Sequence, residues 1–349
     1  MAKSKPIGLG IVGLGRAGRG MHCKELQTRG EMFQIVAGCD TAADRRERFA
    51  REQGCCVYGN IKDLIADPNV EMVDIATRSS DHYQHAMMAL KAGKGVFLEK
   101  PMCLTYAEAR WLQAAAKKSK GRLYIRHNRR FEGAFNQVRD IISSGVLGEV
   151  YQIKLARVSY NRRNDWQTLI SFGGGQLLNW GPHIIDHALR LLGSPVEGIW
   201  SDLKRVAAVG DAEDHFKIVL VGKNRRMVDV EISGGATTKL PQYVVWGTKG
   251  GLTCDGKTIE LKYLDPSAKL PPCKASPGNP GEGFGNPEKL KWVEKTVPVE
   301  PMDMSQIWDH LYNAVRKGRR FPITLDEAVQ VMWVVSQAKK GTKFQLRRR

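Results

Sequence analysis

The chain has 349 residues, of which 42% are hydrophobic, and 54 Lys and Arg against 36 Asp and Glu give it a formal net charge of +18. This length exceeds what one hydrophobic core usually organises, so two domains are expected. No apolar run approaches the roughly 20 residues that span a bilayer, and the apolar start lacks the small-residue cleavage site of a secretory signal. We therefore expect a cytoplasmic globular protein without a membrane partner.

The cysteines indicate whether disulfides or a metal site are expected, and the distribution of basic residues indicates the kind of binding partner. The seven cysteines are an odd number and form no C-x-x-C, which is typical of reduced thiols rather than of disulfides or a zinc site. No bound metal is expected. Short basic clusters such as Arg129-Arg130 and Arg319-Arg320 lie far apart in the sequence. We therefore expect an anionic small ligand, and no nucleic acid, as the partner.

Strand-like and helical patterns alternate along about the first 125 residues. Strands are predicted at 6–12, 33–40, 70–77, 95–101 and 122–127. Helices are predicted between them at 18–29, 42–53, 79–93 and 105–118. Strands that alternate with helices of this length predict a parallel, doubly wound sheet.

The pattern changes after about His127. A helix is predicted at 135–144, strands at 148–160, 216–222, 226–234 and 242–248, and closing helices near 306–317 and 325–339. Residues 264–301 are rich in Pro and Gly and predict a long loop. The second half is predicted to be an α+β domain on a large, open, mostly antiparallel sheet. The domains are expected to span 1–126 and 127–349.

The pattern G-x-G-x-x-G occurs twice near the N-terminus, in overlapping registers. Gly8 and Gly10 fall inside the predicted first strand, whereas Gly13, Gly15 and Gly18 stand between that strand and the next helix, where a dinucleotide-binding turn belongs. Gly13 would permit the tight turn, Gly15 the approach of a pyrophosphate, and Gly18 close packing of the helix. A pyrophosphate would lie at the helix N-terminus, so the expected contacts are Gly13, Gly15, Arg16, Ala17 and Gly18.

Asp40 ends the second predicted strand, 22 residues after Gly18. A carboxylate at this place accepts hydrogen bonds from a ribose 2′-hydroxyl and repels a 2′-phosphate, which favours NAD over NADP. Arg45 and Arg46 keep NADP open as the alternative. Their plainer interpretation is a solvated helix face.

Glu99-Lys100-Pro101 directly follows a predicted buried strand. The carboxyl ends of parallel strands are where doubly wound folds place their ligands. Pro101 favours an extended backbone at Lys100 and so fixes the direction in which the chain leaves the strand. The alternative is an exposed charged turn.

A second candidate segment starts with three glycines at 173–175 and continues as a helical pattern to Leu192. Asn179, His183 and Asp186 share one face at helical spacing. Burying such a polar stripe is costly unless the groups have partners or a function. A satisfied core histidine is the alternative for His183, and Asp186 would orient its ring. Pro182 predicts a kink before His183 or a helix that restarts there.

Four motifs in this order resemble the Gfo/Idh/MocA family of oxidoreductases, which includes glucose–fructose oxidoreductase and inositol dehydrogenase. They are the glycine turn, T-x-x-x-x-H at 77–82, E-K-P at 99–101, and three glycines followed by G-x-H-x-x-D at 173–186. The segments HNRRF at 127–131, SSGVLGEV at 143–150 and GRRFPITLDEAVQVMWVV at 318–335 are also similar to the family. The resemblance therefore covers nearly the whole chain.

The resemblance implies an N-terminal Rossmann domain that binds NAD. It also implies a C-terminal domain that binds substrate and forms a homodimer or homotetramer through its sheet. Lys100 and His183 would flank the nicotinamide and the substrate, and Asn179 stands where the family usually has Asp. Asn179 and Asp186 complete the expected catalytic set. The further cofactor contacts that the resemblance implies are Thr77, Arg78, His82, Glu99, Lys100 and Asn128.

The implied activity is hydride transfer between NAD and a secondary hydroxyl of a sugar, cyclitol or glycoside. His183 would accept the hydroxyl proton, and Lys100 would stabilise the developing alkoxide. Donor-rich residues before the glycines are expected to line the pocket together with Asn179 and His183, namely Arg157, Tyr160, Asn164 and Trp166. Two alternatives stay open: a redox-assisted, NAD-dependent glycoside-cleaving enzyme, and a non-catalytic NAD- or sugar-binding protein.

Overall fold

The first of two sheets is built from the N-terminal third of the chain. The computed structural model describes residues 5–119, 122–278 and 288–345. Six strands pair in parallel in the order β3-β2-β1-β4-β5-β6. Their bounds are β1 Ile7–Val12, β2 Phe33–Cys39, β3 Cys56–Tyr58, β4 Met72–Ile75, β5 Gly95–Glu99 and β6 Leu123–Arg126. The predicted doubly wound parallel sheet is confirmed, and the order reverses between β1 and β4, where such folds bind their ligands.

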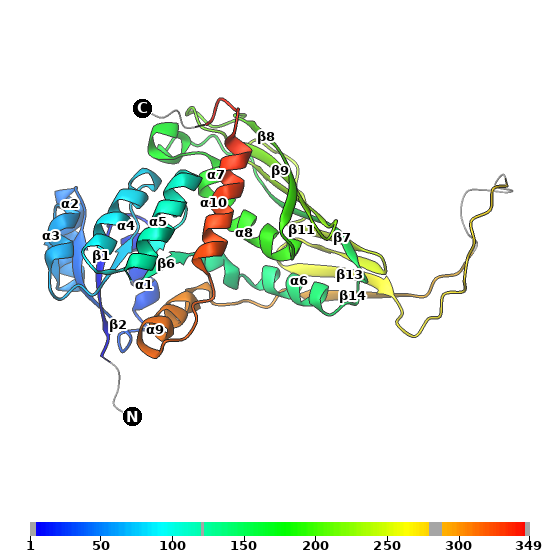
Figure 1. Ribbon diagram of the computed structural model, residues 1–349, viewed down its shortest axis with the longest axis horizontal. Coiled ribbons are helices and arrows are strands. Elements are labelled where there is room, and N and C mark those ends of the chain that lie inside the picture. The colour runs from blue at the N-terminus through cyan, green and yellow to red at the C-terminus, as the bar shows by residue number, and fades with distance from the viewer. Residues whose placement is uncertain (1–4, 120–121, 279–287, 346–349) are drawn as a thin grey trace.

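Helices cover both faces of this sheet (Figure 1). Apolar residues of α3, α4 and α5 pack on one face, and those of α1 and α9 pack on the other. Thr105 and Glu108 form a capping box that fixes the start of α5. The bounds are η1 Gly18–His22, α1 Cys23–Leu26, α2 Ala43–Gln53, α3 Ile61–Ala66, η2 Ser79–Asp81, α4 His82–Lys91 and α5 Tyr106–Lys118.

The second sheet has eight strands in the order β14-β13-β12-β11-β7-β10-β9-β8. Only β7 and β10 pair in parallel among the described strands of this sheet, so the predicted open, mostly antiparallel sheet is confirmed. The bounds are β7 Val150–Val158, β8 Val196–Lys204, β9 His215–Gly222, β10 Met227–Ser233, β11 Tyr243–Gly247, β12 Gly250–Cys254, β13 Thr258–Leu264 and β14 Trp292–Pro298.

Several strands were not predicted, namely β3, β8, β12, β13 and β14. β3 has only three residues, too few for a pattern to show, and glycines interrupt the pattern of β8 and β12. β13 alternates between buried and exposed residues, which was a usable signal. β14 lies inside the predicted loop 264–301, so that part of the prediction is wrong: the strand pairs with β13 along its whole length. Residues 279–287 of the predicted loop lie outside the described residues.

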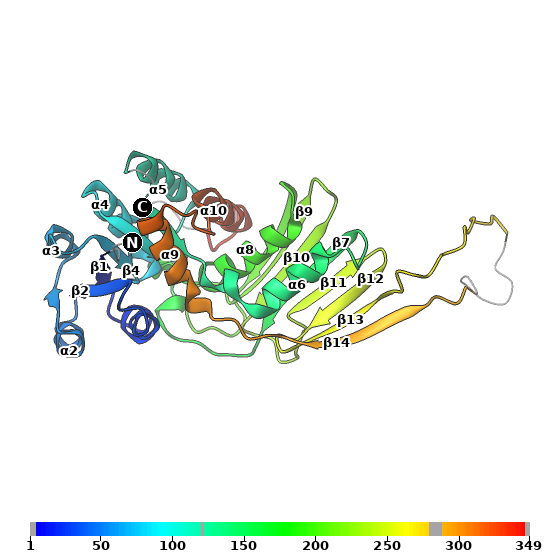
Figure 2. The ribbon, with the colours of Figure 1, turned by 90° about the horizontal axis from the view of Figure 1, so that it is seen from below.

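Helices lie on one face of the second sheet, and no described helix covers the other face (Figure 2). α8 packs on β10, and α10 packs on α5, α8 and β8, so it lies between the two sheets. The bounds are η3 Asn128–Phe131, α6 Gly133–Ser143, η4 Trp166–Thr168, η5 Ile170–Phe172, α7 Gln176–Asn179, α8 Gly181–Leu192, η6 Met304–Gln306, α9 Ile307–Lys317 and α10 Leu325–Lys339.

The chain returns to the first sheet near its end. Trp308 in α9 is fully buried, and its ring centroid lies 5.4 Å from that of Phe33 and 4.7 Å from that of Phe97. The last third of the sequence therefore contributes to the core of the first sheet. The domain boundary between 126 and 127 stays a prediction.

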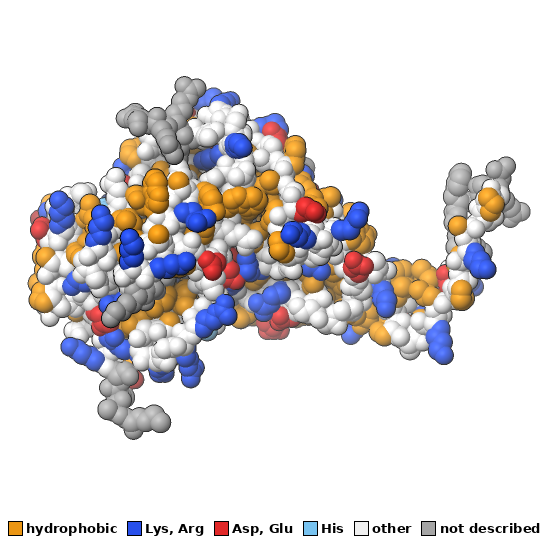
Figure 3. Space-filling view, viewed as in Figure 1, with side chains coloured by type: hydrophobic (Ala, Val, Ile, Leu, Met, Phe, Trp, Pro, Cys, Tyr) orange, Lys and Arg blue, Asp and Glu red, His pale blue; other side chains and the backbone are white. Residues whose placement is uncertain are grey.

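Basic side chains are distributed over the face seen in Figure 3 rather than gathered in one patch. This agrees with the scattered basic clusters of the sequence. Within residues 5–119, 122–278 and 288–345, no helix has the length and apolarity that crossing a membrane requires.

Candidate active site

The turn after β1 is shaped by glycines at two crowded positions. Gly13 has a φ of +97°, and a Cβ there would lie 2.6 Å from the carbonyl oxygen of Ala76. A Cβ on Gly18 would lie 2.1 Å from the carbonyl oxygen of Gly13. The turn and packing roles predicted for Gly13 and Gly18 are therefore confirmed. Gly8 and Gly10 lie inside β1, as the choice of register requires.

The open side of this turn fits an anionic group. A Cβ on Gly15 would meet nothing closer than a nitrogen of Arg45, 3.7 Å away. None of the described hydrogen bonds uses the backbone N–H groups of Gly15, Arg16 or Ala17. Free N–H groups at the start of a helical segment are suited to a pyrophosphate. The residues present thus fit a dinucleotide.

Asp40 ties the end of β2 to the glycine turn. Its carboxylate accepts hydrogen bonds from the backbone N–H of Leu14 (2.9 Å) and of Ala42 (3.0 Å). Arg45 is exposed but lies 3.4 Å from the same carboxylate, and Arg46 donates to the Asp40 carbonyl oxygen at 2.9 Å. Both arginines therefore contact the end of β2 rather than only solvent, and a role for them in cofactor choice stays a prediction.

A buried network of charged groups lies beneath the turn. Within it, His22 Nδ1 donates to Asp74 (2.7 Å) and Nε2 donates to Glu99 (3.0 Å). Arg126 joins Glu99 (2.8 Å) to Glu25 (2.6 Å). The network connects β4, β5 and β6 to the helical segment after the glycine turn, so it holds the floor of the site rigid.

His22 is charged in this network. Both ring nitrogens face carboxylate oxygens, so both must donate, which only the imidazolium does. Burial and the Arg126 charge lower the pKa of His22, but the charge of Asp74 and the hydrogen bonds to Asp74 and Glu99 outweigh them and raise it to about 9. His22 was not predicted as a site residue, and it enters the core through the π-helical turn η1. The surrounding segment at 15–26, GRAGRGMHCKEL, is rich in glycine and charged residues, so no local pattern marked this histidine as buried.

Lys100 and the glycine-rich segment meet in the structure. Lys100 Nζ donates to the backbone carbonyl oxygen of Asn179 at 2.9 Å. Burial lowers the pKa of Lys100, and the nearby positive charges of Arg129, Arg16 and Arg126 lower it further. The Lys100–Pro101 peptide bond is cis. Two segments separated by 79 positions thus converge at the carboxyl end of β5.

His183 stands at the start of α8. The helix begins at Gly181 with Pro182 in its first turn, so the predicted restart at this proline is confirmed. The His183 ring is buried, and Nδ1 has no hydrogen-bond partner among the described residues. Burial, together with the charges of Lys100 and Arg129, holds the pKa of His183 well below its usual range. The ring is therefore neutral near pH 7 and has a lone pair to offer.

Asp186 does not orient His183, so that expectation is wrong. Both carboxylate oxygens accept hydrogen bonds from Arg130, one of them at 2.7 Å from Nε. Arg130 also pairs with Glu327 of α10 at 2.9 Å. The guanidinium matches the carboxylate better than the imidazole does, because it donates two parallel hydrogen bonds. Asp186 thus anchors α8 to η3 and α10.

The remaining predicted cofactor residues line the loops after β4, β5 and β6. The His82 ring is buried, its Nδ1 lies 2.6 Å from the Pro101 carbonyl oxygen, and it thereby ties the loop after β4 to the loop after β5. Thr77 Oγ1 lies 3.3 Å from His85 Nδ1, and the Arg78 guanidinium lies 4.4 Å from the centre of the Phe172 ring. Glu99 belongs to the buried network described above, and Asn128 is half-buried at the start of η3. Cofactor contact at these residues stays a prediction.

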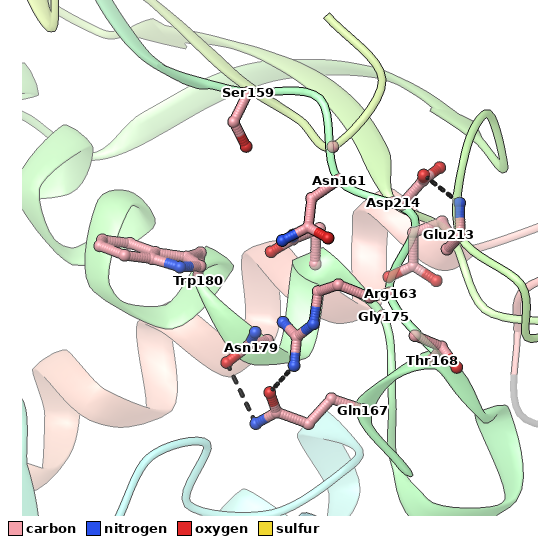
Figure 4. Close-up of a pocket in the computed structure, with 13 residues that line it drawn as sticks. Ser159, Asn161, Arg163, Gln167, Thr168, Gly175, Asn179, Trp180, Glu213 and Asp214 are labelled. Carbon is pink, nitrogen blue, oxygen red and sulfur yellow. Dashed lines mark hydrogen bonds between the residues drawn. The ribbon is translucent and has the colours of Figure 1, made fainter. Parts of the chain in front are cut away.

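A pocket opens beside Asn179, as Figure 4 shows. It is lined by Ser159, Asn161, Arg163, Gln167, Thr168, Gly175, Gln176, Asn179, Trp180, Ala208, Glu213, Asp214 and Gly234. Of the residues predicted to bind substrate, Asn179 lines this pocket, and the others do not, namely Arg157, Tyr160, Asn164, Trp166 and His183. Substrate contact at all of these residues stays a prediction. Arg157 donates to Glu132 at 2.7 Å, and Tyr160 is exposed. Extended backbone alternates its side chains, and Ser159, Asn161 and Arg163 are on the side that faces the pocket.

Trp180, Gln167 and Glu213 were also missed. Trp180 directly follows Asn179 in the sequence, and its ring lies 4.2 Å from the Arg129 guanidinium. Glu213 is buried, and burial raises its pKa. Its position before β9 carries no motif, so the sequence offered no signal for it. The position of Trp180 beside a predicted catalytic residue was a usable signal.

Comparisons with known proteins identify the family of the chain. The sequence model described as "Oxidoreductase family, NAD-binding Rossmann fold" matches residues 7–127, and that of the GFO/IDH/MocA C-terminal domain matches residues 135–253. An uncharacterized oxidoreductase of Schizosaccharomyces pombe is 31% identical over 290 residues, which cover 80% of this chain and 76% of that protein. The chain belongs to the GFO/IDH/MocA family. The chain is therefore an enzyme of the class of NAD(P)-dependent dehydrogenases.

Two further relatives cover nearly the whole chain. The scyllo-inositol 2-dehydrogenase (NADP(+)) IolW of Bacillus subtilis is 26% identical over 353 residues, which are 98% of this chain and 95% of that protein. The crystal structure of an NAD-binding protein from Listeria innocua superimposes with a TM-score of 0.83 at 24% identity and covers 97% of this chain and 98% of that one. The likeness to the second protein shows the fold.

Proposed function

We propose that this protein transfers a hydride between NAD and a secondary hydroxyl of a sugar, cyclitol or glycoside. The observation that carries the proposal is the hydrogen bond of Lys100 Nζ to the carbonyl oxygen of Asn179, because it joins the E-K-P segment to the segment that holds His183. The pocket beside Asn179 is lined mainly by polar side chains, with Trp180 among them. Hydroxyl-rich rings are bound by such a combination of hydrogen-bonding groups and an aromatic face.

His183 acts on the substrate proton, and Lys100 stabilises the negative charge that develops on the substrate oxygen. The bound nicotinamide supplies the hydride chemistry. His183 is neutral near pH 7, so its free lone pair accepts the hydroxyl proton of the alcohol and the imidazolium returns it in the reverse direction. The Lys100 ammonium donates a hydrogen bond to the oxygen on which negative charge develops. Burial is the largest cause of the lowered pKa of each group, and pKa values perturbed by burial and neighbouring charges are typical of functional sites.

We also propose NAD as the preferred cofactor. Asp40 presents a carboxylate at the end of β2, where it would repel a 2′-phosphate. Arg45 lies beside it and offers a positive charge. The Asp40 carboxylate is buried and hydrogen-bonded to the turn, whereas the Arg45 side chain is exposed, so we expect the carboxylate to set the preference.

The face of the second sheet that no described helix covers is proposed as the contact between two copies of the chain. Tyr151, Trp246 and Trp292 are 50%, 43% and 41% exposed and line one shallow depression on it. Exposed aromatic side chains gathered on one surface mark interaction sites. A homodimer would cover them.

Replacing Lys100 with Met and His183 with Asn tests the enzymatic proposal. Turnover on a panel of sugars and cyclitols, followed as NADH formation, is expected to fall by about 10²- to 10⁴-fold in each variant. NADH affinity, measured by fluorescence titration, is expected to stay within a few-fold of wild type. Lys91→Met, on the exposed side of α4, is the matched control. Near-normal turnover of both site variants on a substrate that the wild type converts would refute the assignment.

A further inference from the structure

His127 is a buried histidine that the proposed mechanism does not use. It directly follows β6, at the carboxyl end of the first sheet, and it is 3% exposed. Its ring centroid lies 6.4 Å from that of His183, and the two ring planes are inclined at 83°. The positive charge of Lys100 acts on both rings. Two imidazoles from distant segments of the chain therefore stand together beside Lys100.

Each of the two rings has one enclosed nitrogen without a partner. His183 Nδ1 and His127 Nδ1 are both buried, and neither makes a hydrogen bond within residues 5–119, 122–278 and 288–345. Enclosing a polar atom without a partner is costly, so two such atoms on neighbouring rings indicate a partner that they share. The Nε2 atoms of the two rings are not enclosed in this way, so they are the nitrogens that reach accessible space.

A water molecule is suited to join the two Nδ1 atoms. The centroid separation of 6.4 Å exceeds a hydrogen bond of about 3 Å plus the distance from each centroid to its ring nitrogen, so the rings do not bond directly. A water molecule accepts and donates in tetrahedral directions, which suits two nearly perpendicular rings. Buried waters typically bond polar atoms that have no partner in the protein.

The surroundings of His183 disfavour a lasting positive charge on its ring. Burial and the positive charges of Lys100 and Arg129 hold its pKa well below the usual range. Such an imidazole accepts a proton at one nitrogen more readily if it gives up the proton of the other nitrogen in the same step. His183 therefore needs an acceptor on its enclosed side.

His127 has the chemistry of that acceptor. Burial lowers its pKa to about 4, although the negative charge of Asp186 acts in the opposite direction. The ring is therefore neutral near pH 7, with one N–H group and one lone pair. A neutral imidazole takes a proton at one nitrogen and releases one from the other, so it passes a proton on without storing it.

We propose that His127 receives the proton that leaves His183 Nδ1, through one water molecule between the two Nδ1 atoms. The substrate O–H bond breaks as an N–H bond forms at His183 Nε2. His183 Nδ1 gives its proton to the water, the water gives one of its protons to His127 Nδ1, and His127 Nε2 releases its proton to solvent. The hydride goes to the nicotinamide, so one proton per turnover leaves the site.

The path also returns to its starting state. Each ring ends the reaction with one proton, but in the other tautomer. Once product has left, a solvent proton enters at His127 Nε2, the same transfers run backward, and His183 Nε2 releases its proton to the emptied cleft. His127 acts through His183 and does not touch the substrate, so it is a positioning residue. This inference rests on the proposed function and names the route by which its proton leaves.

The tautomers of the two rings test the inference without turnover. The path requires the resting proton of His183 on Nδ1 and that of His127 on Nε2. Two-bond ¹H–¹⁵N correlation spectra of the purified protein, labelled with ¹⁵N-histidine, distinguish these tautomers at pH 7, and His183→Asn and His127→Asn assign the signals. Finding both tautomers supports the inference. A proton on His127 Nδ1 overturns it and leaves the proposed function standing.

Proton movement during the reaction is measured as a proton inventory. The single-turnover rate of NADH formation from scyllo-inositol and from methyl β-D-glucoside is followed at increasing fractions of D₂O. Several protons that move together give a curved plot in the wild type. In His127→Asn the amide oxygen accepts from the water but passes no proton on. A straight plot and a rate lower by about tenfold or more are expected there, with KM within about twofold of wild type.

His187→Asn is the matched control. His187 is a buried histidine of α8 whose two nitrogens are already paired, Nδ1 with the Tyr243 hydroxyl at 3.1 Å and Nε2 with the Arg129 carbonyl oxygen at 2.8 Å. Its loss removes a buried imidazole and two hydrogen bonds from the same helix. We expect lower stability in this variant but a plot that stays curved, so an effect of packing alone is recognised.

The outcomes separate the inference from the proposed function. A straight wild-type plot, or a curved plot that His127→Asn preserves, overturns the inference, while the turnover itself supports the proposed function. If no sugar or cyclitol is converted, the proposed function is wrong, and the tautomers alone decide the inference. A proton on His183 Nε2 contradicts both, because that nitrogen then has no lone pair for the substrate proton.

Discussion

His22 gives the protein a pH-dependent stability that can be worked out from the structure. The imidazolium is buried between Asp74 and Glu99, with Arg126 on the far side of Glu99. Its pKa of about 9 in the folded chain compares with an ordinary value of 6.5. A group whose pKa is raised by folding stabilises the folded state fully below the unfolded value of 6.5, and this stabilisation is lost as the pH rises through about 9.

The magnitude follows from the two pKa values. One pH unit corresponds to about 1.4 kcal/mol, so His22 contributes about 3 kcal/mol at pH 5.5 and almost nothing at pH 10. In His22→Gln this contribution is absent at every pH. The difference in unfolding free energy between wild type and His22→Gln is therefore expected to shrink by about 3 kcal/mol across this range.

Urea unfolding at several pH values between 5.5 and 10 measures the difference. Arg19→Gln is the control, because it removes an exposed ion pair with Glu52 in the same segment. The pKa of Arg19 is raised and that of Glu52 is lowered, so neither group titrates in this window, and the effect of the control should be flat. If the difference in unfolding free energy between wild type and His22→Gln is also independent of pH, His22 is not charged in the folded protein.

Three further predictions concern the cofactor site and the sheet. Gly15→Ala should fold with wild-type stability but weaken NAD binding by about tenfold or more in a titration, because the added Cβ occupies only the open side of the turn. Gly18→Ala should instead lower the midpoint of thermal unfolding, because the added Cβ meets the Gly13 carbonyl oxygen. Equal stability of the two variants would contradict this. Asp40→Ser should raise the NADP affinity relative to NAD by about tenfold, and an unchanged ratio would show that Asp40 does not set the preference. Trp246→Asp should reduce the mass measured by light scattering to that of one chain, and a wild type that is itself a single chain would refute the proposed dimer.

The elements with strong local signals could be predicted from the sequence. The predicted helices near 306–317 and 325–339 match α9 and α10 almost to the residue, and Thr324 with Glu327 forms the capping box that fixes the second. The choice of the second glycine register follows from the strand that contains Gly8 and Gly10. Helix ends and turns of this kind are determined by residues a few positions apart, so they can be predicted from the sequence alone.

The site was less predictable because it depends on partners far apart in the sequence. Asp186 was assigned to His183, three residues away, but it pairs with Arg130, which is 56 positions away. His22 finds Asp74 and Glu99 only once three parallel strands lie side by side. Which side chains of residues 159–163 face the pocket depends on where the pairing of β7 ends. A shift of one residue would turn the opposite set of side chains toward the pocket.

The central claim is that Lys100 and His183 meet over one bound substrate. A crystal structure of the non-reacting complex with NAD⁺ and scyllo-inosose tests it most directly. We expect the carbonyl oxygen within hydrogen-bond distance of both Lys100 Nζ and the His183 ring, with the pyrophosphate on the N–H groups of Gly15 to Ala17. A ketone bound elsewhere, or a His183 ring still enclosed in the packed interior, would contradict it.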